Sequence, residues 1–139
     1  MKIMLDPGST LPTRGFPTDA GLDLYSREEQ IILPGGNAVF DTGVHVELPH
    51  GTFGKLESKS GLHHNYNIVC LGGVVDESYR GSIRVKLTNA GDKPYMVRKG
   101  QKIVQMIIQP YLAPELEVVT ELSETDRGSN GFGSTGDGL

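Results

Sequence analysis

The segment GSIRVKLTN, at residues 81–89, alternates apolar and polar side chains along its length. Successive side chains of a β-strand point to opposite faces, so this alternation predicts a strand with one buried and one exposed face. The segment therefore favours a β fold in which one face of a sheet is covered. The side chains expected to face the core are Ile83, Val85 and Leu87, and those expected to face solvent are Arg84, Lys86 and Thr88.

Outward from this segment, the rest of the chain also predicts short strands. KIVQMIIQP, residues 102–110, is almost wholly apolar and predicts a strand covered on both faces. NIVCLGGVVD, residues 67–76, predicts a buried strand that Gly72 and Gly73 interrupt with a hairpin or a bulge. One helical turn is expected to begin near Ser60, with that serine as its N-cap. Further strands are expected at residues 22–26, 30–36, 43–48 and 115–122.

The composition supports an all-β prediction. The chain has 139 residues, of which 37% are apolar, so it is long enough to form one domain with a real core. It contains 19 glycines and 8 prolines, and so many turn-forming residues are typical of short strands joined by tight turns. We find no internal repeat and no interdomain linker, and we expect roughly eight to ten strands in a sandwich, barrel or jelly roll.

Charge and cysteine content limit the classes of function. The formal net charge is −4 and no basic run is present, so direct nucleic-acid binding is not expected, although a small phosphorylated ligand is compatible with this charge. Cys70 is the only cysteine, which rules out an internal disulfide and fits a reducing compartment. The N-terminus has no apolar run of signal-peptide length. No stretch of ~18 consecutive apolar residues occurs, so we expect a cytoplasmic location and no membrane span.

Two segments interrupt the strand pattern with charged groups. VVDESYRG, residues 74–81, places Asp76 directly after a buried run, where partial desolvation suits a carboxylate to act as a base. The alternative is an aspartate that forms an ordinary turn. SKSGL, residues 58–62, combines a cation, two hydroxyls and a glycine at a predicted helix start, where backbone N–H groups attract an anion. The alternative there is an ordinary capped turn.

Two polar residues lie inside predicted strands. Asp23 stands between Leu22 and Leu24, so alternation places it on the opposite face from both leucines. It is then either a solvent-facing side chain or an outer-shell ligand of a hard cation, which prefers oxygen donors. Gln105 lies within an apolar strand, where its amide needs partners. It either bonds neighbouring backbone, lines a subunit interface or donates to a ligand oxygen.

The C-terminal segment RGSNGFGSTGDGL, residues 127–139, is rich in glycine and carries one aromatic side chain and one cation. Its glycines allow backbone N–H groups to converge on an anion, and the hydroxyls of Ser134 and Thr135 can add donors. Arg127 offers a planar fork to phosphate, and Phe132 can stack on a nucleobase. The alternative is a disordered terminus, which such compositions commonly form.

In their order along the chain, these segments resemble the five motifs of the trimeric dUTPase (dUTP pyrophosphatase) family. AGLDLYS resembles the first motif, ESKSGL the second, GGVVDESYRG the third, KIVQMI the fourth and RGSNGFGSTG the fifth. Together they run from residue 20 to residue 136. The resemblance implies a homotrimer in which residues 1–126 form a jelly roll, or distorted β-barrel. Its three active sites would lie at subunit interfaces, and each would take residues from all three chains. Residues 127–139 would form a flexible arm that closes over a site in a neighbouring chain.

The resemblance also implies Mg²⁺-assisted hydrolysis of dUTP to dUMP and pyrophosphate, which keeps uracil out of DNA and supplies dUMP for thymidylate synthesis. Asp76 would be the general base that activates water for attack on the α-phosphorus. Tyr79 would pack on the deoxyribose, and Asp23 would hold the metal through water. The backbone of Cys70, Gly73 and Val75 would read the uracil edge, and Phe132 would stack on the ring. The residues implied in phosphate contacts are Lys59, Ser60, Gly61, Gln105, Arg127, Gly131, Gly133, Ser134 and Thr135.

The chain departs from the family pattern at three positions. Lys59 stands where the second motif usually has Arg, so that position keeps its charge but loses a bidentate fork. Lys102 stands where the fourth motif commonly has Arg. Asn130 replaces a usual Gly, with a mild effect expected because Asn tolerates a positive φ. Two other functions stay open at this point: a dCTP deaminase, which shares this fold, and a nucleotide-sensing protein whose trimer grips a regulatory partner.

Overall fold

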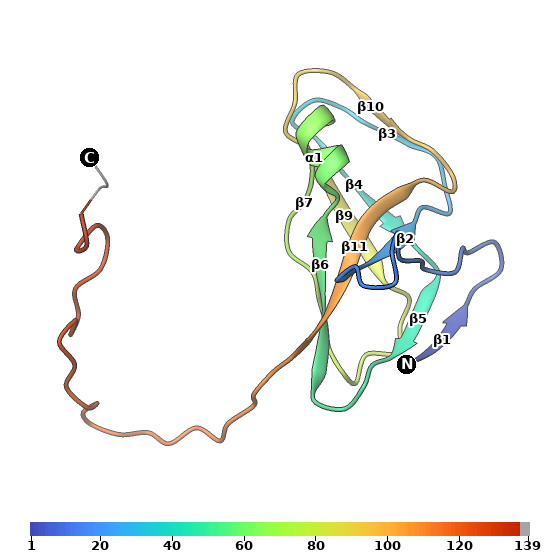
Figure 1. The fold of residues 1–139 in the computed structure, drawn as a ribbon. Coiled ribbons are helices and arrows are strands. Elements are labelled where there is room, and N and C mark those ends of the chain that lie inside the picture. The colour runs from blue at the N-terminus through green and yellow to red at the C-terminus, as the bar shows by residue number, and fades with distance from the viewer. Residues whose placement is uncertain (137–139) are drawn as a thin grey trace.

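The structure is a computed structural model that describes residues 1–136. Eleven strands and one short helix make up a β body, from which the C-terminal part of the chain extends as a long arm (Figure 1). The elements are β1 (Lys2–Leu5), β2 (Gly21–Tyr25), β3 (Gln30–Ile32), β4 (Asn37–Asp41), β5 (Val44–Glu47), β6 (Thr52–Ser58), α1 (Ser60–Tyr66), β7 (Ile68–Cys70), β8 (Val74–Val75), β9 (Arg84–Asn89), β10 (Tyr95–Val97) and β11 (Lys102–Pro110).

Two larger sheets form the body. One has the strand order β2-β11-β6-β8 and the other has the order β4-β9-β7, while β1 pairs with β5 and β10 pairs with β3. Every pairing is antiparallel, and most neighbours in a sheet are distant in sequence. This arrangement is a jelly roll, as the sequence predicted. No helix among residues 1–136 has the length and apolar character that crossing a membrane requires.

In β9 and the residues just before it, the alternation of residues 81–89 gives one buried and one exposed face, as predicted. The three inward apolar side chains are 0–1% exposed, whereas Arg84 and Lys86 are exposed and Thr88 is half-buried. Across the core, Phe40 of β4 is fully buried, as are Val104 and Met106 of β11. One continuous cluster of apolar side chains therefore joins both larger sheets.

Two predicted strands differ from those observed. The expected strand at 115–122 is not formed, and its side chains Leu116 and Val118 are 94% and 99% exposed. Alternation alone cannot make a strand where no neighbouring edge is present to pair with it. Residues 67–76 form two short strands in different sheets, since β7 pairs with β9 and β8 pairs with β6. The predicted interruption at Gly72 and Gly73 is present, but the two parts join different sheets and do not form a hairpin or a bulge, and Leu71 and Val74 are exposed and not buried.

The helix begins one residue earlier than a Ser60 cap would require. Lys59 has extended backbone angles and is the N-cap residue, without a side-chain cap, while Ser60 is the first helical residue. Asn67 ends the helix with a positive φ of 54°, and its N–H group bonds the carbonyl of His63. Asn is one of the few residues other than Gly that tolerate this conformation.

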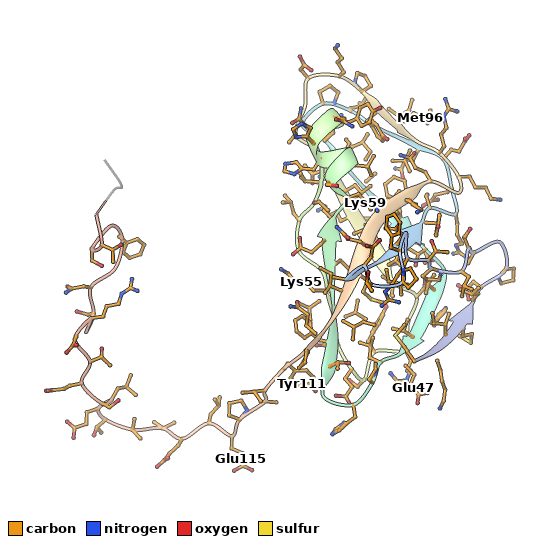
Figure 2. The ribbon with its side chains drawn as sticks, viewed as in Figure 1. Glu47, Lys55, Lys59, Met96, Tyr111 and Glu115 are labelled. Carbon is orange, nitrogen blue, oxygen red and sulfur yellow. The ribbon has the colours of Figure 1, made fainter. Side chains whose placement is uncertain are left out.

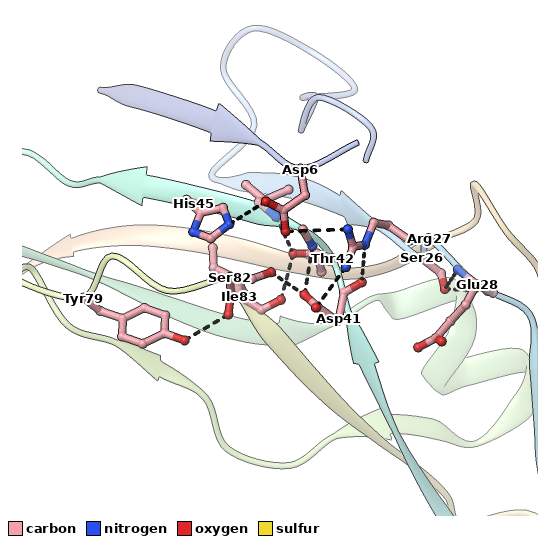
Figure 3. Close-up of polar contacts among 12 residues, drawn as sticks. Asp6, Ser26, Arg27, Glu28, Asp41, Thr42, His45, Tyr79, Ser82 and Ile83 are labelled. Carbon is pink, nitrogen blue, oxygen red and sulfur yellow. Dashed lines mark hydrogen bonds and ion pairs between the residues drawn. The ribbon is translucent and has the colours of Figure 1, made fainter. Parts of the chain in front are cut away.

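A network of ion pairs and hydrogen bonds joins the N-terminal segment to β4 and to Ser82, which lies just before β9 (Figure 3). Arg27 Nη2 lies 2.9 Å from Asp41 Oδ2, and Arg27 Nη1 lies 3.6 Å from Asp6 Oδ2. Asp41 also accepts hydrogen bonds from the Ser82 hydroxyl and the Gly43 amide. These contacts anchor the loop that follows the third motif against the N-terminal part of the chain.

Candidate active site

One sheet carries four of the five motif segments. In the strand order β2-β11-β6-β8, the strands belong to the first, fourth, second and third segments respectively. Asp23 is paired with Gln105, and Gln105 is paired with Glu57, two residues before Lys59. The fold therefore brings together residues that are more than 80 positions apart in sequence, such as Asp23 and Gln105.

Asp23 is buried and doubly paired. Its side chain is 6% exposed, with Lys59 Nζ 2.5 Å from Oδ1 and Lys102 Nζ 2.8 Å from Oδ2. Burial raises the pKa of Asp23, but the hydrogen bonds and charges of the two lysines outweigh this and hold it below its usual value. The solvent-facing alternative for Asp23 is therefore wrong. Both lysines at positions where the family usually has Arg contact this one carboxylate.

Gln105 bonds neighbouring backbone, which was one of the alternatives for it. Its Nε2 donates to the carbonyl oxygen of Ser58 at 3.1 Å. A Cβ atom added at Gly21 would lie 2.0 Å from Gln105 Oε1, so Gly21 is required for this close approach. The contact holds Gln105 against the end of β6, just before Lys59 and the exposed residues Ser60 and Gly61. Lys59, Ser60, Gly61, Gln105 and Asp23 consequently form one polar group, which we call the phosphate-side group.

Asp76 begins a turn at the other end of this sheet. It follows β8 directly, it is exposed, and its carbonyl accepts the N–H group of Tyr79 at 3.0 Å. Within one chain, Asp76 is therefore not buried, so the partial removal of water that was expected to suit it as a base is absent. Asp76 lines two hollows of the surface, one of about 740 Å³ shared with Glu77 and Tyr111 and one of about 180 Å³ shared with Gly73, Val75 and Tyr79.

Tyr79 depends on a glycine that sequence reasoning missed. The Tyr79 hydroxyl donates to the Ser82 carbonyl at 3.0 Å, which lays the ring over Gly81. A Cβ atom at Gly81 would lie 2.3 Å from Tyr79 Oη and 2.5 Å from Cζ. In the sequence, the only sign of this role for Gly81 is its place two residues after Tyr79.

The segment from Cys70 to Val75 also depends on close backbone approaches. Gly73 has a φ of +126°, and an added Cβ atom would lie 2.7 Å from Cβ of Leu56. Its carbonyl accepts the Leu56 N–H group at 2.9 Å. The Cys70 N–H group donates to the Ser58 hydroxyl at 2.9 Å, and burial raises the pKa of the Cys70 thiol. This cysteine is therefore no activated nucleophile, and it fits the expected backbone role.

One chain does not bring Asp76 to the phosphate-side group. Val75 is paired with Gly54, whereas Lys59 follows Ser58 at the far end of the same strand. Lys59 comes five positions after Gly54, and at the rise of an extended chain this is roughly 16 Å. A base must lie within hydrogen-bond reach of the reacting water, so both sets of residues cannot serve one phosphorus atom within one chain.

The arm does not return to the body of its own chain (Figure 2). Every hydrogen bond found for residues 123–136 joins two residues of the arm, and Phe132 is fully exposed. Asn130 does not have the positive φ expected for it; Phe132 has one instead, at 48°. Residues 137–139 lie outside the described part of the chain. The other arm residues expected in the site, which are also exposed, are Arg127, Gly131, Gly133, Ser134 and Thr135.

The described residues do not form a protein-only metal site. Among residues 1–136, no group of three or more His, Cys, Asp or Glu side chains lies close enough together to hold a metal ion. Both oxygens of Asp23 already contact ammonium groups. The donor set therefore fits a cation held mainly by phosphates of a ligand and by water, as Mg²⁺ commonly is, with Asp23 at most in its outer shell.

Fold and motif arrangement together define a β jelly-roll protein with a candidate nucleotide-phosphate site. A family profile described as dUTPase matches residues 8–136, and the chain belongs to that family. The deoxyuridine 5′-triphosphate nucleotidohydrolase of Clostridium acetobutylicum is 43% identical over 134 residues, which covers 95% of this chain and 92% of the relative. The human mitochondrial enzyme of the same name is also 43% identical, over 95% of this chain and 52% of its own length.

Solved structures of phage dUTPases are similar to this chain. The dUTPase of Staphylococcus bacteriophage 80alpha with dUpNHpp matches with a TM-score of 0.92 and 30% identity, covering 97% of both chains. The dUTPase of the Staphylococcus aureus phage phi11, described with a structural Mg(II) ion, matches with a TM-score of 0.81 and 27% identity over 86% of this chain and 96% of its own. The fold of the family is therefore retained throughout the body.

Proposed function

We propose that this protein hydrolyses dUTP to dUMP and pyrophosphate. The observation that carries the proposal is the position of four motif segments on adjacent strands of one sheet, with Asp76 at the mouth of a surface hollow. The names of the curated relatives and the dUTP analogue bound to the phage 80alpha dUTPase support the same substrate. These names also argue against the dCTP deaminase alternative.

Asp76 is the proposed general base. It would accept a proton from the water that attacks the α-phosphorus, and phosphoryl chemistry needs little further covalent help from the protein. The exposure of Asp76 in one chain supports a site that is covered only when substrate and neighbouring residues are in place. Tyr79 would pack against the deoxyribose and leave no room for a 2′-hydroxyl, with Gly81 allowing the ring to lie flat.

The uracil and the phosphates are assigned to different segments. The backbone of Cys70, Gly73 and Val75 would read the uracil edge, which the pronounced turn at Gly73 supports. Lys59, Ser60, Gly61 and Gln105 would contact the phosphates, because they form one polar group at the end of β6 and the start of α1. A lysine at position 59 neutralises phosphate charge as a point charge and not as a fork.

The active unit is proposed to be a homotrimer with three shared sites. The separation between Asp76 and the phosphate-side group supports this, because a second copy of the chain could supply the missing half. The arm would close over the site of another copy. Phe132 would stack on the uracil, while Arg127, Gly131, Gly133, Ser134 and Thr135 would hold the triphosphate.

Mg²⁺ is the proposed cofactor, and it would supply neutralisation of phosphate charge when bound with the nucleotide. Asp23 would contact its water molecules, and the two lysines keep this carboxylate ionised. We assign the enzyme to the cytoplasm, where its product would serve thymidylate synthesis and its action would keep uracil out of DNA. A second role as a nucleotide-sensing protein that grips a regulatory partner would be supported by co-purification of a partner that dUTP displaces.

The test is a nucleotide panel with pyrophosphate detection. With Mg²⁺ present, the full-length chain should release pyrophosphate from dUTP and much less from dTTP, dCTP or UTP. Release of ammonia from dCTP would instead support a deaminase. Equal hydrolysis of all four nucleotides would show that the proposed specificity is wrong.

A further inference from the structure

Glu77 directly follows Asp76, and its carboxylate accepts three hydrogen bonds. His50 Nδ1 lies 2.7 Å from Oε1, and both the Gly51 N–H group and the Tyr111 hydroxyl lie 2.9 Å from Oε2. The side chain is only 25% exposed. The Gly51 amide, and then His50 and Tyr111, hold the pKa of Glu77 below its usual value, so the group is ionised near neutral pH. One charged side chain thus joins three separate segments.

Tyr111 marks the point at which the extended C-terminal part of the chain leaves the body (Figure 2). The arm predicted from residue 127 onward is the distal part of this extension. It is the first residue after β11, and its N–H group donates to the Gly51 carbonyl at 3.1 Å. Its ring meets that of Phe53 edge to face, with centroids 6.4 Å apart. The side chains that follow, such as Leu112 and Leu116, are each 94% exposed. The bond from Tyr111 to Glu77 is therefore one of the last contacts between the body and the arm.

Glu77 is also fixed within the turn that presents the proposed base. Its carbonyl accepts a hydrogen bond from Arg80 Nη1 at 2.7 Å, and the Asp76 carbonyl accepts the Tyr79 N–H group. The backbone of this turn is thus held internally, and the Glu77 carboxylate is its link to the turn before β6, at His50 and Gly51, and to Tyr111. A change in that link would be passed to Asp76 through one peptide unit.

We propose that Glu77 is a positioning residue that couples the turn carrying Asp76 and Tyr79 to the root of the arm at Tyr111. This inference rests on the proposed dUTP hydrolysis. Glu77 does not contact the reacting atoms; it holds Asp76 in place and sets the direction in which the arm leaves the body. The arm is proposed to close over another copy's site. The Glu77–Tyr111 contact would therefore couple the placement of Asp76 in one site to the covering of a second site by the arm.

The test is a double-mutant cycle on the full-length protein, with dUTP as substrate. Glu77→Ala removes all three contacts, whereas Tyr111→Phe removes only the hydroxyl bond and keeps the ring against Phe53. We expect Glu77→Ala to lower kcat by about tenfold or more, since small displacements of a catalytic group have large effects. We expect Tyr111→Phe to raise KM by a few fold with a smaller change in kcat. In the double variant Tyr111→Phe should add nothing, because its partner is already absent.

A second readout follows the arm itself. Bound dUpNHpp should slow tryptic cleavage after Arg127 in the wild-type protein, and it should protect Glu77→Ala and Tyr111→Phe less. Glu47→Ala, which removes an exposed carboxylate paired with Lys2, is the matched control and should leave both readouts unchanged. The inference would be overturned if the effects of Glu77→Ala and Tyr111→Phe on dUTP hydrolysis were additive in the double variant. An unchanged kcat in a folded Glu77→Ala protein would also overturn it. Absence of dUTP hydrolysis by the wild type would instead contradict the proposed function.

Discussion

Lys59 Nζ lies 2.5 Å from Oδ1 of Asp23, so the second motif segment is joined to the first by a nearly buried ion pair. Lys102 completes the arrangement from β11, with its Nζ 2.8 Å from the other oxygen. The carboxylate is thus the centre around which three of the motif segments are organised. Because Asp23 is buried, breaking this ion pair should change the free energy of unfolding more than breaking an ion pair on an open surface.

Asp23→Asn should destabilise the fold, because it leaves two ammonium groups without a counter-charge beside a buried amide. We expect a loss of roughly 1–3 kcal/mol in the free energy of unfolding, since both lysines are partly exposed and solvent reduces the penalty. Urea denaturation at pH 7 measures this. Asp92→Asn in the turn after β9 is the control, and equal stabilities of the two variants would contradict the prediction.

The pH dependence of stability should include a contribution from His45. Its Nε2 lies 3.1 Å from Asp6 Oδ1 (Figure 3), and its Nδ1 lies 2.7 Å from the Arg80 carbonyl. Both partners only accept hydrogen bonds. The Arg80 carbonyl first, and then Asp6, raise the pKa of His45 above 6.5. The stabilisation is therefore fully present below pH 6.5 and is lost as the pH rises through the raised value.

Denaturation curves between pH 5.5 and pH 8.5 check this sign. The free energy of unfolding should decrease on the alkaline side of pH 6.5, as the imidazole loses its proton, and His45→Gln should remove that part of the decrease. His64→Gln on the exposed side of α1 should leave it in place. A decrease of equal size in His45→Gln would exclude His45 as its source.

Gly81→Ala should disturb sugar recognition with little effect on folding. The added methyl group would overlap the Tyr79 hydroxyl, and the partly exposed ring can swing away. We expect the preference for dUTP over UTP to fall by roughly tenfold, the size of effect typical for one altered packing contact. Steady-state kinetics on both nucleotides measures the ratio. If Tyr79→Ala lowers the ratio but Gly81→Ala does not, the glycine has no role in placing the ring.

Removal of the arm from Arg127 onward should leave the body intact but nearly inactive. The described arm residues 127–136 bond only one another and Thr125, which is itself outside the β body, so the free energy of unfolding should change by less than about 0.5 kcal/mol. Turnover of dUTP should fall by about 100-fold or more, because the arm is proposed to cover the reacting phosphates. Undiminished turnover in the truncated chain would show that the arm is not part of the site.

Local pattern predicted the fold where one sheet face is clearly buried. The alternation around Val85 is read correctly because the core covers one side of β9. The same alternation at residues 115–122 gave a wrong strand, since pattern describes the chain and not the presence of a pairing edge. Alternation also left open a solvent-facing Asp23, and it could not exclude this because the lysines that cover the carboxylate come from distant segments.

The resemblance named the candidate site residues and implied that each site takes them from neighbouring chains. It did not give their separation within one chain, where the strand register puts Asp76 and Lys59 at opposite ends of β6. Glu77 and Gly81 were missed because their roles depend on contacts with Tyr111 and Tyr79 that only the folded chain reveals. A turn glutamate and a glycine are too common in sequences to attract notice alone.

The central claim is that Asp76 and the phosphate-side group act together only between two copies of the chain. Asp76→Asn and Lys59→Ala/Ser60→Ala chains, each inactive alone, can be co-expressed with two different tags and isolated as mixed assemblies. In a mixed trimer, one site joins an intact base to an intact phosphate side, so dUTP turnover should recover to about one third of the wild-type value. No recovery in purified mixed trimers would place both halves of the site in one chain and contradict the account.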